Sequence, residues 1–286
     1  MQILITGVKG RLGSQLLTKL SVDGHTVSGF DIDTTDITNL DSVTKSFASA
    51  QPELVLHCAA LTAVDYCAEH PDDALRVNGL GTQNIAIACQ RHGAALLYIS
   101  TNEVFNGQGN RPYLEYDLPA PINSYGYSKW VGEQIVRDLL PHFYLVRTSW
   151  LFAHGGNNFI QTILRLAGEG RALRVVTNEV STPTYTEDLV GAIARLITTG
   201  RYGIYHLVNE GYASRYAFAQ YALEQAGYDP ALVKPITLAE YQRASRPPEY
   251  SVLRNFAAAQ IGITLRPWQA AVDAFLAAEP ALKNHD

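Results

Sequence analysis

Two side chains that could move a proton, Tyr125 and Lys129, lie four residues apart in a stretch expected to be helical, so they share one helix face. A ketone that accepts a hydride becomes an alkoxide and needs a proton donor near pH 7, whereas a phenol has a pKa near about 10. A neighbouring ammonium stabilises the phenolate, and lowering the phenol pKa by ~3 units takes about 4 kcal/mol. The pair therefore indicates acid–base chemistry at a carbonyl group, with the Thr101 hydroxyl as a second group on the ketone oxygen.

The spacing alone is a weak signal, because the chain has 16 tyrosines and chance matches are expected. A packing tyrosine beside a surface lysine is the alternative interpretation. The surroundings favour catalysis, since Tyr125 follows, by one loop, a predicted strand that ends at Ser100 and Thr101. Open parallel sheets bind ligands at the carboxyl ends of their strands, which is where this tyrosine is expected to lie.

A glycine-rich turn, Gly7-Val8-Lys9-Gly10-Arg11-Leu12-Gly13, follows the first predicted strand directly and opens a helix. Glycines permit the tight turn and let the backbone approach a pyrophosphate, whose charge is stabilised at the helix N-terminus. A tight turn that binds nothing is the alternative. With Tyr125 and Lys129 downstream, the arrangement predicts a dinucleotide site in which Lys129 also holds the nicotinamide ribose.

Two groups of residues give opposing indications about which nicotinamide dinucleotide is bound. Asp31 ends the second predicted strand, where a carboxylate accepts hydrogen bonds from the adenosine ribose diol, and this favours NADH. Lys9 and Arg11 in the glycine turn can neutralise a 2′-phosphate, and this favours NADPH. Asp36 and Ile37 are expected to flank the adenine. The residues themselves leave the choice open.

The elements that position these residues alternate as short apolar runs and longer amphipathic stretches, the pattern of βα units in a parallel sheet. Strands are predicted over residues 2–6, 26–30, 54–60, 94–100, 143–148, 173–177 and 203–208. Helices are predicted over residues 12–24, 72–92, 125–140, 159–168 and 186–197. The fold class is therefore α/β, a doubly wound parallel sheet of the Rossmann type with a small discontinuous substrate-binding lobe.

The same alternation suggests how the chain is divided. Residues 1–150 are expected to form the dinucleotide-binding Rossmann domain, continued by about 173–208. Residues of about 151–172 and 209–254 are expected to form the substrate-binding lobe, and 255–286 a C-terminal helical segment. Neither an internal repeat nor a low-complexity linker occurs, so we expect the lobe to pack tightly on the sheet.

Composition and patterning exclude several classes of protein. Only 17% of the 286 residues are charged, the net charge is −5 and no basic stripe occurs, so no nucleic-acid partner is expected. The sequence contains no apolar run of 18 residues, which argues against a membrane span, and residues 1–7 resemble a strand and not a signal peptide. Cys58, Cys67 and Cys89 lack CxxC spacing, so we expect free thiols in a reducing cytoplasm and no metal site.

These features resemble those of one family, the extended short-chain dehydrogenases of the dTDP-4-dehydrorhamnose reductase type, over nearly the whole chain. Besides the glycine turn and Tyr125/Lys129, the resemblance rests on short motifs: Thr62-Ala63-Val64-Asp65, Val77-Asn78, Ser100-Thr101 before Val104-Phe105, Arg147-Thr148-Ser149-Trp150, Asn157-Asn158-Phe159, Pro183-Thr184 with Asp188-Leu189, and Arg246-Pro247 before Tyr250-Ser251. It implies an NADPH-dependent oxidoreductase, with NADH as the alternative cofactor. The implied reaction is reduction of the 4-keto group of a nucleotide-activated 6-deoxy sugar, above all dTDP-4-dehydro-L-rhamnose to dTDP-L-rhamnose.

The resemblance also implies roles for individual residues. Tyr125 would donate the proton, Lys129 would assist it, and Thr101 would contact the ketone. The cofactor would be held by Gly7, Gly10, Arg11, Leu12, Gly13, Asp31, Asp36, Ile37, Ala59, Ala60 and Leu61, together with Tyr125 and Lys129. Asn102 and Trp150 would touch the sugar nucleotide with Thr101, although Trp150 could instead be a core tryptophan. The implied enzyme is cytoplasmic, takes a nucleotide sugar, binds neither nucleic acid nor membranes, and is compatible with a homodimer.

One departure from the family pattern bears on the reaction. The family usually has Ser-Thr-Asp-Tyr-Val-Phe, whereas this chain has Asn102 and Glu103 after Thr101. The result resembles the Thr-Asp-Glu signature of nucleotide-sugar 4,6-dehydratases, but an amide cannot act as the acid that elimination requires. A dehydratase or epimerase of the same superfamily is therefore the second interpretation. A third is a non-catalytic NADP-binding subunit, like the regulatory subunits of methionine adenosyltransferase, against which the complete Thr101, Tyr125 and Lys129 set argues.

Overall fold

The centre of the molecule is a six-stranded parallel sheet, seen in a computed structural model that describes residues 1–155 and 158–278. The strands are β1 (Gln2–Thr6), β2 (Thr26–Phe30), β3 (Leu54–His57), β4 (Ala95–Thr101), β5 (Phe143–Thr148) and β10 (Gly203–His206). Their order is β10-β5-β4-β3-β1-β2, with parallel pairing throughout. This confirms the doubly wound α/β class. Asn157 and the end of the expected C-terminal segment, 279–286, lie outside the described residues.

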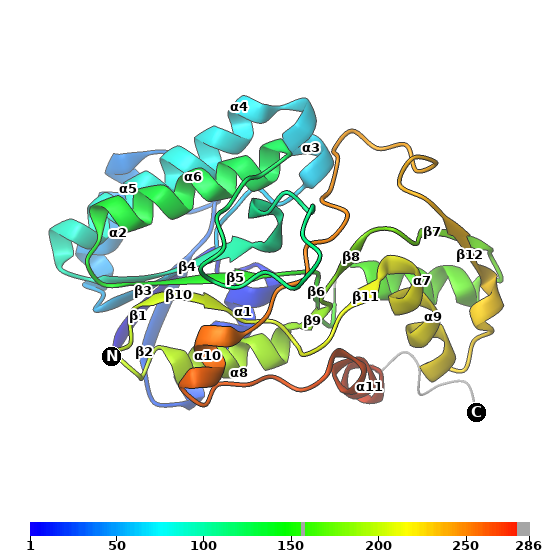
Figure 1. The fold of residues 1–286 in the computed structure, drawn as a ribbon. Helices are drawn as coiled ribbons and strands as arrows, with labels where there is room; N and C mark the ends of the chain where they lie inside the picture. The colour runs from blue at the N-terminus through cyan, green and yellow to red at the C-terminus, as the bar shows by residue number, and fades with distance from the viewer. Residues whose placement is uncertain (156–157, 279–286) are drawn as a thin grey trace.

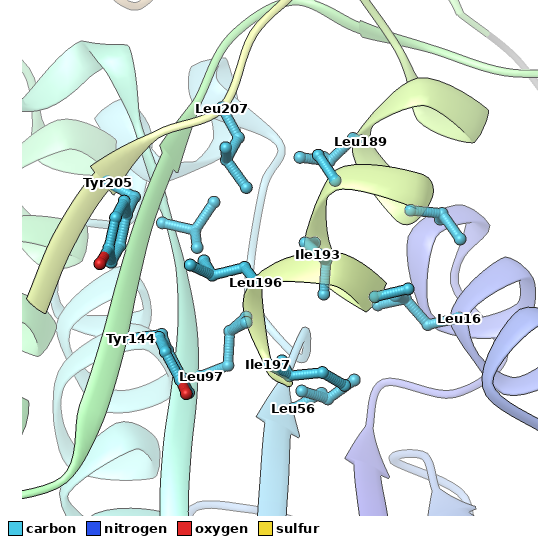
Figure 2. Close-up of a cluster of buried hydrophobic side chains, with 14 of the residues drawn as sticks. Leu16, Leu56, Leu97, Tyr144, Leu189, Ile193, Leu196, Ile197, Tyr205 and Leu207 are labelled. Carbon is cyan, nitrogen blue, oxygen red and sulfur yellow. The ribbon is translucent and has the colours of Figure 1, made fainter. Parts of the chain in front are cut away.

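Alternate residues of each strand enter two different cores, as expected for strands buried on both faces. One face is covered by α1 (Arg11–Val22) and α8 (Thr186–Leu196) (Figure 1). Figure 2 shows this core, in which Leu56 and Leu97 of the sheet meet Leu16 of α1 and Ile193 of α8. The other face is covered by α2 (Leu40–Ala50), α5 (Thr82–His92) and α6 (Ser124–Leu139). Because the strand order reverses between β1 and β3, a ligand site is expected at their carboxyl ends.

A second core lies beyond the carboxyl edge of the sheet and forms the lobe. Its helices are α7 (Phe159–Gly168), α9 (Arg215–Gln225) and α11 (Trp268–Ala278), which share one core with the parallel pair β7 (Leu173–Val176) and β12 (Val233–Ile236). Two short pairs connect it to the sheet: β6 (Leu151–Phe152) with β9 (Thr184–Tyr185), and β8 (Val180–Ser181) with β11 (Ala213–Ser214). The expected division assigned β7 to the Rossmann domain and α11 to a separate segment. We therefore propose that both belong to the lobe, because their buried side chains share its core.

The remaining helical segments are short: α3 (Val64–Glu69), α4 (Pro71–Ala74), a π-helix (Leu75–Gly81), the 3-10 turns Asn102–Val104 and Pro230–Leu232, and α10 (Phe256–Gln260). Two predicted details are wrong, and one further helix was missed. The third strand ends at His57 and not at residue 60, because the chain leaves the sheet there and the Ala59 amide donates to the Thr6 hydroxyl instead. The helix predicted over 72–92 contains the π-helical turn. The helix Leu40–Ala50 was not predicted.

Candidate active site

A cavity of about 990 Å³ runs along the carboxyl edge of the sheet, between the Rossmann domain and the lobe. It brings together fifteen of the sixteen predicted site residues: Gly7, Gly10, Arg11, Leu12, Gly13, Asp31, Ile37, Ala59, Ala60, Leu61, Thr101, Asn102, Tyr125, Lys129 and Trp150. Asp36 does not line the cavity, and its carboxylate accepts hydrogen bonds from the backbone amide and hydroxyl of Thr38, both at 2.9 Å. Within the described residues, no cluster of His, Cys, Asp and Glu could hold a metal ion, and no helix has the length and apolar character to span a bilayer.

The glycine turn forms one end of the cavity. Gly7 has φ +68°, and a Cβ there would lie 2.8 Å from the backbone of Ala59, so only glycine allows the turn to approach the β3 loop. Helix α1 begins directly afterwards, with Gly10 as N-cap and no side-chain capping bond. A Cβ at Gly10 would meet only the Gly7 carbonyl oxygen within 4 Å. The start of this helix lines the cavity, and its first-turn backbone amides fit a pyrophosphate there.

The end of β2 borders the same cavity. The two carboxylate oxygens of Asp31 accept the backbone amides of Lys9, at 2.9 Å, and Ile32, at 2.8 Å. Asp31 is thereby fixed at the cavity wall next to the glycine turn. The Lys9 ammonium forms an ion pair with Asp33 on the protein surface, and this carboxylate raises the pKa of Lys9. Asp33 thus competes with any 2′-phosphate for the Lys9 charge.

The loop after β3 forms another wall of the cavity. It is held in place by Asn78, the buried asparagine of the Val77-Asn78 motif. The Asn78 side chain accepts the Leu61 amide at 2.8 Å and donates to the Leu61 carbonyl at 3.0 Å. It also donates to the Ser128 hydroxyl on α6 at 2.9 Å. A single amide group therefore joins the cofactor side of the cavity to the helix that carries Tyr125 and Lys129.

Helix α6 carries the two titrating groups into the cavity. Asn123 caps the helix by accepting the Gly126 amide at 2.8 Å. Burial lowers the pKa of Lys129 to about 7, and the Glu133 carboxylate opposes this decrease. Burial and the nearby Glu103 carboxylate raise the pKa of Tyr125, while a hydrogen bond with Thr101 acts in the opposite direction. The expected decrease of the phenol pKa is therefore not supplied by the protein alone, because desolvation outweighs the hydrogen bond with Thr101.

The 3-10 turn after β4 places Asn102 and Glu103 beside Tyr125. Asn102 is buried and donates to the hydroxyls of Ser251, at 2.7 Å, and Ser181, at 3.3 Å. Glu103 is half-buried, lines the cavity and accepts a hydrogen bond from Asn123 at 2.7 Å. Burial raises the pKa of Glu103 to about 7, a neighbouring Glu179 adds to the rise, and Arg243 and Arg215 oppose it.

The far end of the cavity is formed by Trp150 and an arginine that was not predicted, Arg215. Trp150 is half-buried, has φ +42° and packs against the lobe core while also lining the cavity. The Arg215 guanidinium lies 3.6 Å from the centroid of the Trp150 ring and pairs with Glu179 at 3.2 Å. Arg215 lies 65 residues beyond Trp150 in the sequence, in a stretch without a recognisable motif, so no local signal indicated it.

The chain matches the model of one protein family, described as the RmlD substrate binding domain, over residues 1–280. It is 38% identical over 275 residues to the spore coat polysaccharide biosynthesis protein SpsK of Bacillus subtilis, which covers 96% of both chains. It is 39% identical over 281 residues to a dTDP-4-dehydrorhamnose reductase of Mycolicibacterium smegmatis, covering 97% of this chain and 85% of that one. A crystal structure of dTDP-4-dehydrorhamnose reductase from Bacillus anthracis in complex with NADP matches with a TM-score of 0.93 and 38% identity, over 96% of this chain and 98% of that one.

Proposed function

The chain belongs to the RmlD substrate binding domain family, and we propose that it uses NADPH to reduce the 4-keto group of a nucleotide-activated 6-deoxy sugar. The substrate we propose is dTDP-4-dehydro-L-rhamnose, which becomes dTDP-L-rhamnose. The observation that carries this proposal is that one cavity joins the glycine turn to Thr101, Tyr125 and Lys129. NADPH is favoured over NADH because the related B. anthracis reductase was crystallised with NADP.

In the proposed reaction, NADPH supplies a hydride to the ketone carbon. The Tyr125 phenol, whose raised pKa keeps it protonated at neutral pH, gives its proton to the carbonyl oxygen. The Thr101 hydroxyl hydrogen-bonds to the same oxygen. The Lys129 ammonium stabilises the phenolate that forms on Tyr125 and holds the nicotinamide ribose.

We propose the remaining contacts from the order of the residues along the cavity. The start of α1 would receive the pyrophosphate, and Asp31 would accept the hydroxyls of the adenosine ribose. Ile37 would flank the adenine, while Asp36 would act on it only indirectly, through the turn that it stabilises. Asn102 and Trp150 would form the wall on the sugar-nucleotide side.

The second candidate is 4,6-dehydration, and the observation that favours it is Glu103, a cavity carboxyl whose pKa is raised to about 7. A base near its working pKa could remove a carbon-bound proton. The candidate ranks below reduction because the neighbouring position carries the amide of Asn102, which cannot act as the acid. We further propose a cytoplasmic location, supported by three free cysteines, and a homodimer, which sedimentation would measure directly.

The test is NADPH and NADH oxidation against a panel of dTDP-, UDP- and GDP-4-keto-6-deoxy sugars, with the wild type and two variants. Tyr125→Phe is expected to keep its affinity for NADPH but to lose at least about a hundredfold in turnover, the usual contribution of a positioned acid. Tyr127→Phe is the matched control, because Tyr127 lies on the same helix but is 45% exposed and does not line the cavity. Near-normal turnover in Tyr125→Phe would remove the proposed proton donor, and inactivity of the wild type towards every sugar would remove the proposed reaction.

A further inference from the structure

The aromatic ring beneath the Lys129 side chain is a feature that the proposed function does not use. Tyr98 lies on β4, is fully buried and does not line the cavity. The Lys129 ammonium lies over its ring, 4.2 Å from the centroid. The Tyr98 hydroxyl donates a hydrogen bond to the backbone carbonyl of Lys129 at 3.1 Å. A single side chain therefore contacts both the backbone and the charged end of the lysine.

Helix α6 is shaped to accept this ring. Gly132 lies one turn after Lys129, and a Cβ there would overlap the Tyr98 hydroxyl and approach the ring carbon that bears it, at 2.8 Å. The glycine thus leaves the space in which the phenol lies against the helix. Because the ring is enclosed between β4 and α6, its distance from the ammonium is set by the packing of the two elements.

Most of the other titratable groups around the Lys129 ammonium are neutral, so the Tyr98 ring is a principal direct contact of its charge. On β3, His57 is held between the hydroxyls of Thr6 and Thr82, and burial lowers its pKa to about 3, so it is neutral. Burial raises the pKa of Cys58 to about 12, so this thiol is neutral as well. On α6, Tyr125 carries no charge at neutral pH, and the Glu133 carboxylate accepts hydrogen bonds from Ser100 and Arg147.

We propose that Tyr98 is a positioning residue, whose ring face holds the Lys129 ammonium in its charged form at the cavity wall. The electron-rich face of an aromatic ring attracts a cation, and the attraction is stronger where water is excluded, as it is around this side chain, which is 3% exposed. A charged Lys129 stabilises the phenolate that Tyr125 becomes. This catalytic consequence rests on the proposed reductase function, whereas the effect on the charge of Lys129 does not.

The primary experiment is an NMR titration of the full chain labelled with ¹³Cε-lysine and free of added ligand, comparing Tyr98→Leu with Tyr98→Phe. Tyr98→Leu removes the ring, and the Lys129 pKa is expected to fall by about 1.5 pH units relative to Tyr98→Phe, the size of a desolvated cation–π contact. Tyr98→Phe removes only the hydroxyl and is expected to titrate like the wild type. An equal Lys129 pKa in the two variants would overturn the proposal.

A stepwise series keeps the test independent of folding, because a leucine in this packed position could prevent the chain from folding. Phenylalanine at position 98 is replaced by its mono-, di- and trifluorinated forms, which withdraw charge from the ring face with little change of shape. The Lys129 pKa should fall with each fluorine, and a flat series would overturn the proposal. In the enzyme assay, the alkaline limb of the pH profile of kcat should move to lower pH in the same order. If the NMR series falls but no sugar nucleotide is reduced, the positioning role stands and the proposed function fails.

Discussion

The buried ion pair between Glu133 and Arg147 provides a quantitative test of how the carboxyl edge of the sheet is held. Glu133 is 0% exposed and Arg147 1% exposed. One carboxylate oxygen accepts the Ser100 hydroxyl at 2.6 Å and the arginine Nε at 2.8 Å, and the other accepts an arginine Nη at 2.6 Å. The pair joins α6, four residues after Lys129, to β5 and to the end of β4. The perturbation is Glu133→Leu, Arg147→Met and the double variant.

Desolvation determines the expected magnitudes. Removing one member of a buried pair leaves the other charge without a partner, so each single variant should lose about 3–5 kcal/mol of unfolding free energy. The double variant removes both charges and leaves mainly the Ser100 hydroxyl unpaired, which costs about 1–3 kcal/mol. The single losses should therefore exceed the double loss, with a coupling energy of at least about 3 kcal/mol.

The assay is urea unfolding followed by far-ultraviolet circular dichroism, used where one transition is seen, with thermal midpoints as a check. For a chain of this size, a loss of about 4 kcal/mol lowers Tm by about 8–16 °C. The two single variants should also differ in pH dependence. An unpaired Glu133 can accept a proton, so Arg147→Met should regain stability as the pH falls towards about 4, whereas an unpaired arginine in Glu133→Leu cannot lose its charge. Additive losses, with the double variant as unstable as the sum of the singles, would show that the two side chains are not coupled.

Three further predictions concern the cavity. Gly10→Val should abolish NADPH binding in calorimetric titration while keeping the circular dichroism spectrum. The reason is that a Cβ there meets only the Gly7 carbonyl, and the rest of the side chain enters the space beside the α1 amides. Unchanged affinity would exclude a phosphate-binding turn. Incubation with dTDP-glucose and oxidised cofactor should give no 4-keto-6-deoxy product by mass, because Asn102 cannot donate a proton; such a product at an enzymatic rate would assign the protein to the dehydratases. The pKa of Glu103 is raised to about 7 in the folded chain, so its contribution to stability is lost as the pH rises from about 4.5 through 7. The Tm of Glu103→Gln should therefore increase relative to that of the wild type between pH 5 and pH 8. A Tm difference that stays the same over this range would contradict the assigned pKa.

The parts of the site that could be predicted from the sequence are those that local spacing determines. The glycine turn lies between a strand and a helix that are adjacent in the chain, and Tyr125 and Lys129 are one helical turn apart. Strand and helix periodicity then place both groups at the same edge of the sheet, because all six strands are parallel. A short motif was sufficient wherever its members line the same cavity from one βα unit.

The parts that could not be predicted depend on contacts between distant segments. Arg215 reaches Trp150 across 65 residues, and Asp65 accepts the backbone amide and hydroxyl of Ser245 across 180. Such contacts leave no periodicity in the sequence. The π-helical turn at Leu75–Gly81 was also missed, because a wider turn keeps nearly the same pattern of apolar residues as an α-helix. The third strand was extended to residue 60 because its apolar character continues after the chain has left the sheet.

This chain has Asn102 where the family pattern has an aspartate. The direction of the hydrogen bonds that the Asn102 side chain makes gives a structural reason for this difference. The Ser181 hydroxyl donates its hydrogen to the Ser251 carbonyl at 3.0 Å, so its oxygen can only accept from the side chain at position 102. An amide nitrogen donates both to this oxygen and to the Ser251 hydroxyl, whereas an aspartate would bring a carboxylate oxygen against a lone pair in a buried site. Both serines belong to segments that connect the sheet to the lobe. The asparagine therefore satisfies the hydrogen bonds of both connecting segments, and its amide supplies no acid for elimination chemistry.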